Sequence, residues 1–201
     1  MEKQNGFDKL KLNRRSFLAT SSGVALSAAS ILLLSGNEVL AANAKMGKAA
    51  GKEQDISILN TALALEHEGI NAYQIGAESG LLSKDILSVA VSFQSHHKEH
   101  REALIATIKK LGGKPVAEKD IAFYKESLEV GKLKSQEDVL RLAARLEMGA
   151  ISAYIGVMPS FENREITAAA AKLLADEVMH WTTLTSVLKQ ALPSKGLTFG
   201  S

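Results

Sequence analysis

The sequence predicts an all-α fold: a four-helix bundle made of two antiparallel hairpins joined by a long crossover. Three observations support this. Four segments carry apolar residues at helical spacing, and no strand-like alternation of useful length interrupts them. The three prolines, Pro115, Pro159 and Pro193, all fall near proposed helix boundaries. Two connections are only a few residues long, which favours antiparallel neighbours, whereas the third runs from about 113 to 134.

The first hairpin is predicted from its start and stop signals. Its first helix runs from about Ile56 to Glu78, where a Ser-Gly pair ends it. Its second helix begins near the cap candidate Ser83 and ends at Gly112 and Gly113.

The second hairpin follows the crossover, whose middle, residues 121–130, is predicted to form a short extra helix. Its first helix begins at Ser135, with Asp138 three places on, which resembles a capping box with Asp in place of Glu. That helix runs to about Val157. The last helix begins near Asn163 and ends before the final proline.

Residues 1–44 are predicted to be a twin-arginine-type signal peptide. The pair Arg14-Arg15 precedes Phe-Leu, an apolar run covers 23–36, and a small-x-small cleavage signal ends at Ala44. We therefore expect export to the periplasm through the twin-arginine machinery, with cleavage near Ala44. The alternative is an uncleaved membrane tether, although the run is shorter than the ~20 apolar residues of a full span.

The remaining chain divides into a flexible lead-in over 45–54, the bundle over 55–192 and a C-terminal tail over 193–201. Removing the signal takes five of the 24 basic and three of the 22 acidic residues, so the mature chain holds 19 of each. This neutral balance gives no electrostatic reason to expect nucleic-acid binding.

The chain contains no cysteine. This excludes iron–sulfur clusters and rubredoxin-type centres, which need thiolates. Any bound metal must be held by carboxylates and imidazoles.

An internal repeat relates the first helices of the two hairpins. Glu66 is followed by Tyr73, and 81 residues further on Glu147 is followed by Tyr154, with Leu, Ile and Ala also matching. Residues seven apart share one helix face, two turns apart. Because that face also carries apolar positions, both Glu-Tyr pairs are expected to point inward.

The second helices of the hairpins repeat too. When they are aligned on their last histidines, Glu177 and His180 match His97 and His100. Glu66 and His100 are 34 residues apart, and Glu147 and His180 are 33 apart, so both histidines should lie at the same depth in the bundle. Ligands three residues apart project from one helix face.

These motifs resemble the ferritin-like superfamily over roughly residues 55–191. One Glu on each of two helices, plus Glu-x-x-His on each of the other two, is the arrangement of di-iron and di-manganese carboxylate proteins. The resemblance implies two divalent metal ions, iron first and manganese or zinc as alternatives. It places their ligands at Glu66, His97, His100, Glu147, Glu177 and His180.

The second helix departs from this pattern, because His97 stands where the family has a glutamate. The site would then contain three carboxylates and three imidazoles. Alternatively, Glu99 supplies the missing carboxylate from a slightly rotated helix, or one of the two metal positions is weak.

The neighbouring polar residues are interpreted as non-ligands. His96 is expected to face outward or pack beside the site, His67 to be exposed or interfacial, and Glu68, Glu99 and Glu102 to be solvated. The tyrosines of the repeat, Tyr73 and Tyr154, are expected to hydrogen-bond ligand carboxylates from the core. Trp181 is interpreted as packing.

Three functions are compatible with this reading. The first is an oxidoreductase that binds Fe(II) and oxidises it with O₂ or peroxide, as the resemblance implies. The second is a metal-binding or stress-protective protein without turnover, which the departure at His97 supports. The third is a helical interaction module with a degenerate site. A homo-oligomer is possible, but no residue pattern specifies one.

Overall fold

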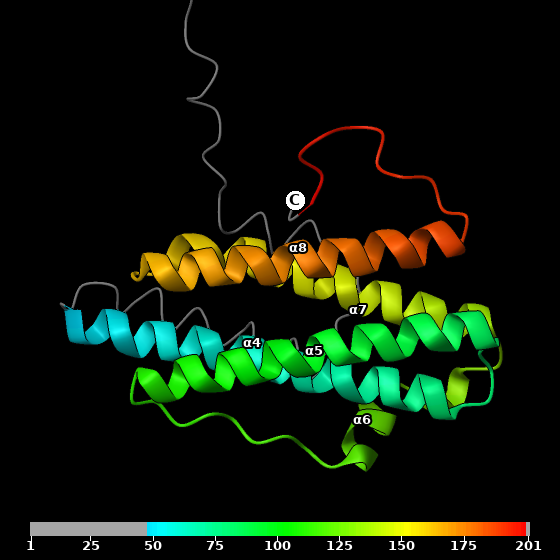
Figure 1. Cartoon of the computed structure of the whole chain (residues 1–201), viewed down its shortest axis with the longest axis horizontal. Coiled ribbons are helices and arrows are strands. Elements are labelled where there is room, and N and C mark those ends of the chain that lie inside the picture. The colour runs from blue at the N-terminus through cyan, green and yellow to red at the C-terminus, as the bar shows by residue number, and fades with distance from the viewer. Residues whose placement is uncertain (1–47, 200–201) are drawn as a thin grey trace, which may run out of the picture.

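A computed structural model of the protein describes residues 48–199, and this part of the chain contains helices and no strand (Figure 1). The all-α prediction is confirmed. Residues 48–199 contain five α-helices, in the order α4 (Lys48–Glu78), α5 (Lys84–Lys110), α6 (Ile121–Ser127), α7 (Gln136–Val157) and α8 (Arg164–Val187). Single 3₁₀ turns at Val130–Lys132 and Met158–Ser160 flank α7. The predicted signal peptide and its cleavage site lie outside the described residues.

The four long helices form two antiparallel hairpins, α4 with α5 and α7 with α8, stacked on each other (Figure 1). The hairpins meet mainly through α4 and α7, while α5 and α8 touch less. The crossover returns along the outer side of α4, and α6 packs there (Figure 1). Within residues 48–199, no helix combines the length and apolar character needed to span a membrane.

Local signals set most helix ends. The Ser135 hydroxyl accepts from the Asp138 amide at 3.2 Å, which is the first bond of the predicted capping box. The Asp138 carboxylate accepts from the Ser135 hydroxyl and from the Lys134 amide, both at 2.9 Å, in place of the Ser135 amide. The Asn163 side chain caps α8 by accepting from the Glu165 amide at 2.8 Å. Gly112, with φ of 78°, supplies the left-handed conformation that ends α5.

The start of α4 corrects a prediction. Residues 48–54, expected to be part of a flexible lead-in, are helical. They are mostly Lys, Ala, Glu and Gln, which are good helix formers without an apolar stripe, so periodicity did not reveal them. Tertiary bonds hold this region: Gln54 donates to the Ser160 carbonyl at 2.9 Å, and Asp55 accepts from the Glu162 amide at 3.1 Å.

The core forms apolar layers on either side of the bundle's middle. One cluster includes Leu63, Ile108 and Tyr154, and another includes Tyr73, Phe93 and Leu184. The two repeat tyrosines therefore belong to different layers. The polar residues of the repeat lie between these layers, where water is excluded.

Candidate metal site

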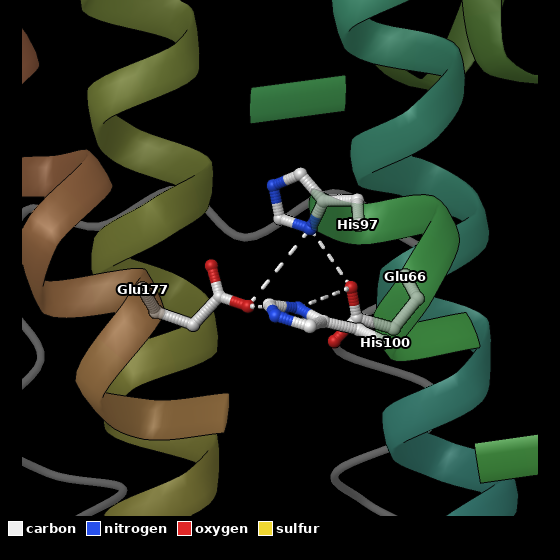
Figure 2. A group of neighbouring side chains, drawn as sticks. All are labelled: Glu66, His97, His100 and Glu177. Carbon is white, nitrogen blue, oxygen red and sulfur yellow. Dashed lines mark hydrogen bonds and ion pairs between the residues drawn. The ribbon is translucent and has the colours of Figure 1, made fainter. Parts of the chain in front are cut away.

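The six predicted ligands converge in the middle of the bundle, and all are buried, with exposed fractions between 0% and 5%. Figure 2 shows Glu66 from α4 and the two α5 histidines reaching toward Glu177 of α8. Each i, i+3 pair places two side chains on one inward face, as the spacing predicted. Their donor atoms form two overlapping groups. Within each group, all the donor atoms lie within 4.8 Å of one another.

The first group contains Glu66, His97, His100 and Glu177. Glu66 Oε2 lies 2.8 Å from His97 Nδ1 and 3.5 Å from His100 Nδ1. Glu177 Oε1 closes the group, 3.3 Å from His100 Nδ1 and 3.9 Å from His97 Nδ1. Two carboxylates and two imidazoles thus face a common centre (Figure 2).

The second group contains His97, Glu147, Glu177 and His180. Glu147 Oε1 lies 3.3 Å from His97 Nε2 and 3.6 Å from His180 Nδ1, and Glu177 Oε2 lies 3.3 Å from His180 Nδ1. Glu177 therefore offers one oxygen to each group. His97 likewise turns one ring nitrogen toward each.

Two buried atoms of the first group lack a hydrogen-bond partner: His100 Nδ1 and Glu177 Oε1. They face each other at 3.3 Å without hydrogen-bond geometry. Unpaired buried polar atoms are costly and therefore rare. Because both are donor types that iron, manganese and zinc accept, the residues fit a metal ion at this position.

The protonation equilibria show how the metal-free cluster balances its charge. Burial alone would raise the pKa of Glu66, but the facing imidazoles of His100 and His97 lower it to about 2. Burial alone would lower the pKa of His100, but the facing carboxylates of Glu177 and Glu66 raise it to about 10. In the metal-free protein, protonated histidines therefore supply the positive charge that balances the carboxylates.

Glu177 behaves differently from the other carboxylates. Burial, together with the charges of Glu147 and Glu66, raises the pKa of Glu177 to about 7. By contrast, burial raises the pKa of Glu147, but the charge of His97 and hydrogen bonds from His180, His97 and Glu177 together hold it well below its ordinary value. The histidines therefore do not fully neutralise the negative charge of the cluster, and Glu177 is the carboxylate that most readily takes up a proton.

The repeat tyrosines bind reciprocally across the two hairpins. Tyr73 of α4 donates to Glu147 Oε1 at 2.5 Å, and Tyr154 of α7 donates to Glu66 Oε1 at 2.9 Å. The expected tyrosine–carboxylate bonds are therefore present, each between hairpins rather than within a helix. They leave the second oxygen of Glu66 directed at the histidines.

Two residues outside the predicted ligand set hold the outer nitrogens of the histidines: Asp176, which was not predicted, and His96, which takes the second of its two expected placements, beside the site. Asp176 Oδ2 lies 3.1 Å from His100 Nε2, and His96 Nδ1 lies 3.0 Å from His180 Nε2. These contacts leave both Nδ1 atoms directed at the carboxylates, a common support for metal-binding histidines. Asp176 and His96 each precede the first residue of a motif, so the repeat alignment itself was the signal for both.

The two candidates on α5 lie differently in the structure. Glu99 is exposed and takes no part in either donor group, whereas His97 belongs to both. Glu102 is exposed, as predicted.

The prediction that Glu68 is solvated was wrong, since it is only 5% exposed. His67 is likewise buried, and its Nε2 contacts the Val116 carbonyl at 3.3 Å. Both residues are covered because the crossover and α6 pack on this side of α4. A sequence pattern does not reveal which helix face a long connection covers.

A helical bundle with a buried carboxylate–histidine cluster at mid-height is the architecture of a ferritin-like domain. The chain belongs to the ferritin-like domain family, whose model matches residues 54–190. Among solved structures it is similar to the conserved hypothetical protein rv2844 from Mycobacterium tuberculosis, with a TM-score of 0.58 and 21% identity. That match covers 73% of this chain and 99% of the other, and it shows the fold alone. No curated protein matches the chain.

Proposed function

We propose that this protein binds two divalent metal ions, one in each donor group, with Glu177 shared between them. Iron is the first candidate, with manganese and zinc as alternatives, and oxidation of Fe(II) by dioxygen or peroxide is the proposed activity. The observation that carries the proposal is the facing pair His100 Nδ1 and Glu177 Oε1, buried, 3.3 Å apart and unpaired.

The electrostatics support bound cations. Three carboxylates that are 2% exposed or less would be expensive to bury without compensating charge. In the metal-free protein that compensation comes from histidine protons, and it is incomplete, since the pKa of Glu177 is raised to about 7. Divalent ions would replace these protons and supply more charge at the same place.

The chain's own residues would hold and orient the ions. The tyrosine bonds fix Glu66 and Glu147, while Asp176 and His96 fix the two outer histidines. When bound, iron would supply the one-electron redox chemistry that no side chain of the site provides. The protein's part is to keep the donors in place and to exclude bulk water from them.

One observation favours a second function, metal binding without turnover. His97 replaces a carboxylate, so the six donors carry one negative charge fewer than the usual set. Fewer carboxylates stabilise the trivalent product of oxidation less well. Stoichiometric zinc in the purified protein, with no oxidation of Fe(II), would favour this function.

The decisive experiment measures the metal content of the purified protein and of its Glu177→Ala variant. We expect bound metal in the natural protein and its loss in the variant. Glu102→Ala, on the exposed side of α5, is the matched control and should retain metal. Equal metal in Glu177→Ala and the natural protein would support a decayed site and an interaction module instead.

Turnover is tested separately by aerobic oxidation of Fe(II). A rate no better than that of buffer would rule out the oxidoreductase, while leaving metal binding intact.

We also propose that the protein is exported to the periplasm by the twin-arginine route, on the basis of Arg14-Arg15 and the segment that follows. A folded bundle could then acquire its metal before leaving the cytoplasm. Replacing both arginines with lysine should block export, whereas unaffected export would contradict the proposal.

A further inference from the structure

We propose that a narrow apolar cavity beside the site admits a small apolar molecule of dioxygen size to its Glu147 side. The proposal rests on the metal-binding function and names the oxidant that this function would use. The cavity has a volume of about 60 Å³ and reaches Tyr73, His97 and Glu147. Among the described residues that line it, Glu66, His100, Glu177 and His180 are absent, so the approach is one-sided.

Aliphatic side chains make up most of the cavity wall. They come from all four long helices and include Val89 of α5, Leu140 and Leu142 of α7, and Leu184 of α8. Among the polar groups of the lining, Tyr73 donates to Glu147, which His97 also contacts, and the other polar or charged side chains are Glu68, Thr183 and Arg145. Water would find few free partners along the aliphatic part of this wall, and apolar cavities of this kind stay dry.

The outer part of the cavity reaches the surface near the C-terminal end of α8. Val187 lines the cavity and is 39% exposed, and Thr183, one turn earlier, is half-buried. Ile86 of α5 lies on the same wall and is also half-buried. The lining therefore extends from partly exposed aliphatic side chains near the end of α8 to the Glu147 carboxylate.

Two glycines of α4 line the cavity at points where neighbouring side chains approach closely. Gly76 of α4 lines the cavity, and a Cβ there would lie 3.1 Å from Val139 Cγ1. Gly69 also lines it, and a Cβ there would lie 3.2 Å from His97 Nδ1. Glycine inside a helix costs about 1 kcal/mol relative to alanine. At these two positions it allows close packing against α7 and the His97 ring.

Size and polarity select the class of molecule. A dry cavity of ~150 Å³ holds benzene, so one of about 60 Å³ is too small for an aromatic or lipid substrate. Peroxide has the right size, but it would lose its hydrogen bonds to water in an aliphatic passage. Dioxygen loses none, and we therefore assign this route to dioxygen.

Xenon is the probe for the cavity, because it is apolar and needs no metal. The full-length protein, as purified and after chelation, is titrated with dissolved xenon while methyl NMR signals are followed. We expect xenon to shift the methyl signals of Leu140 and Leu184, and not that of Leu63 in the opposite apolar layer. Unchanged Leu140 and Leu184 signals would overturn the proposal. If xenon binds but the purified protein neither contains nor takes up metal, the result would contradict only the metal function.

Ala143→Leu fills the cavity from α7, and Ala103→Leu on exposed α5 surface is the matched control. Ala143→Leu should weaken xenon binding by about tenfold or more, equivalent to ~1.4 kcal/mol, and Ala103→Leu should not. If Ala143→Leu does not fold, as judged by circular dichroism, Val89→Phe serves in its place. With iron bound, the filled variant should oxidise Fe(II) more slowly with dioxygen and equally fast with peroxide. Equal slowing with both oxidants would refute the dioxygen route.

Discussion

Replacing Glu177 with glutamine is predicted to stabilise the metal-free protein while abolishing its response to metal. Glu177 is fully buried and is the only carboxylate shared by both donor groups. Its pKa is raised to about 7, from an ordinary value of 4.5, so the folded state disfavours its charge. The resulting penalty is absent below pH 4.5, grows as the pH rises through about 7, and is complete above it.

The size of this penalty follows from the pKa difference. Between 4.5 and about 7, at 1.36 kcal/mol per unit, it amounts to about 3 kcal/mol. Glutamine keeps the shape and cannot ionise. It weakens the contact with His180 Nδ1, now 3.3 Å from the carboxylate, at a cost of about 1 kcal/mol. The free energy of unfolding should therefore rise by about 2 kcal/mol above neutral pH.

Urea unfolding at pH 8 measures the effect, with and without added Fe(II) under anaerobic conditions or with Zn²⁺. The natural protein should gain about 2.7 kcal/mol at a metal concentration one hundred times its Kd, and Glu177→Gln should gain nothing. Glu102→Gln, on the exposed face of α5, should change the unfolding free energy by less than about 0.5 kcal/mol. A destabilised Glu177→Gln variant that still responds to metal would refute the assignment of Glu177 as the shared ligand.

Three further predictions concern the neighbours of Glu177. The metal-free protein should lose stability as the pH rises from 6.5 through about 10, because the folded state binds the His100 proton more tightly than the unfolded state does. Bound metal should remove this pH dependence. Unfolding curves at several pH values, with and without metal, test both expectations. Tyr154→Phe should lower the free energy of unfolding in urea by about 1.5–3 kcal/mol, because it removes the hydroxyl that donates a hydrogen bond to Glu66 Oε1. An unchanged free energy of unfolding would mean that this hydrogen bond is not formed. His97→Glu supplies a fourth carboxylate and should increase both the rate of Fe(II) oxidation and the retention of ferric iron, measured by stopped-flow absorbance. Slower oxidation would show that the reaction needs the imidazole of His97.

Local patterns in the sequence were sufficient to predict the helical bundle. The capping box at Ser135, the cap at Asn163 and the glycines after α5 act through bonds and dihedrals within a few residues, so their effect is readable from the chain. The lead-in over 48–54 was misread because its helix depends on bonds to Ser160 and Glu162, more than one hundred residues away.

The repeat, together with the family resemblance, pointed to the six candidate ligands, because a spacing of three or seven residues on a helix specifies a face wherever the helix lies. Only the tertiary structure decided how those faces meet. It placed His97 between the two groups, turned Glu99 to solvent, and brought Asp176 and His96 to the outer histidine nitrogens. These outcomes depend on the rotation and separation of packed helices, which side-chain packing sets and sequence spacing does not encode.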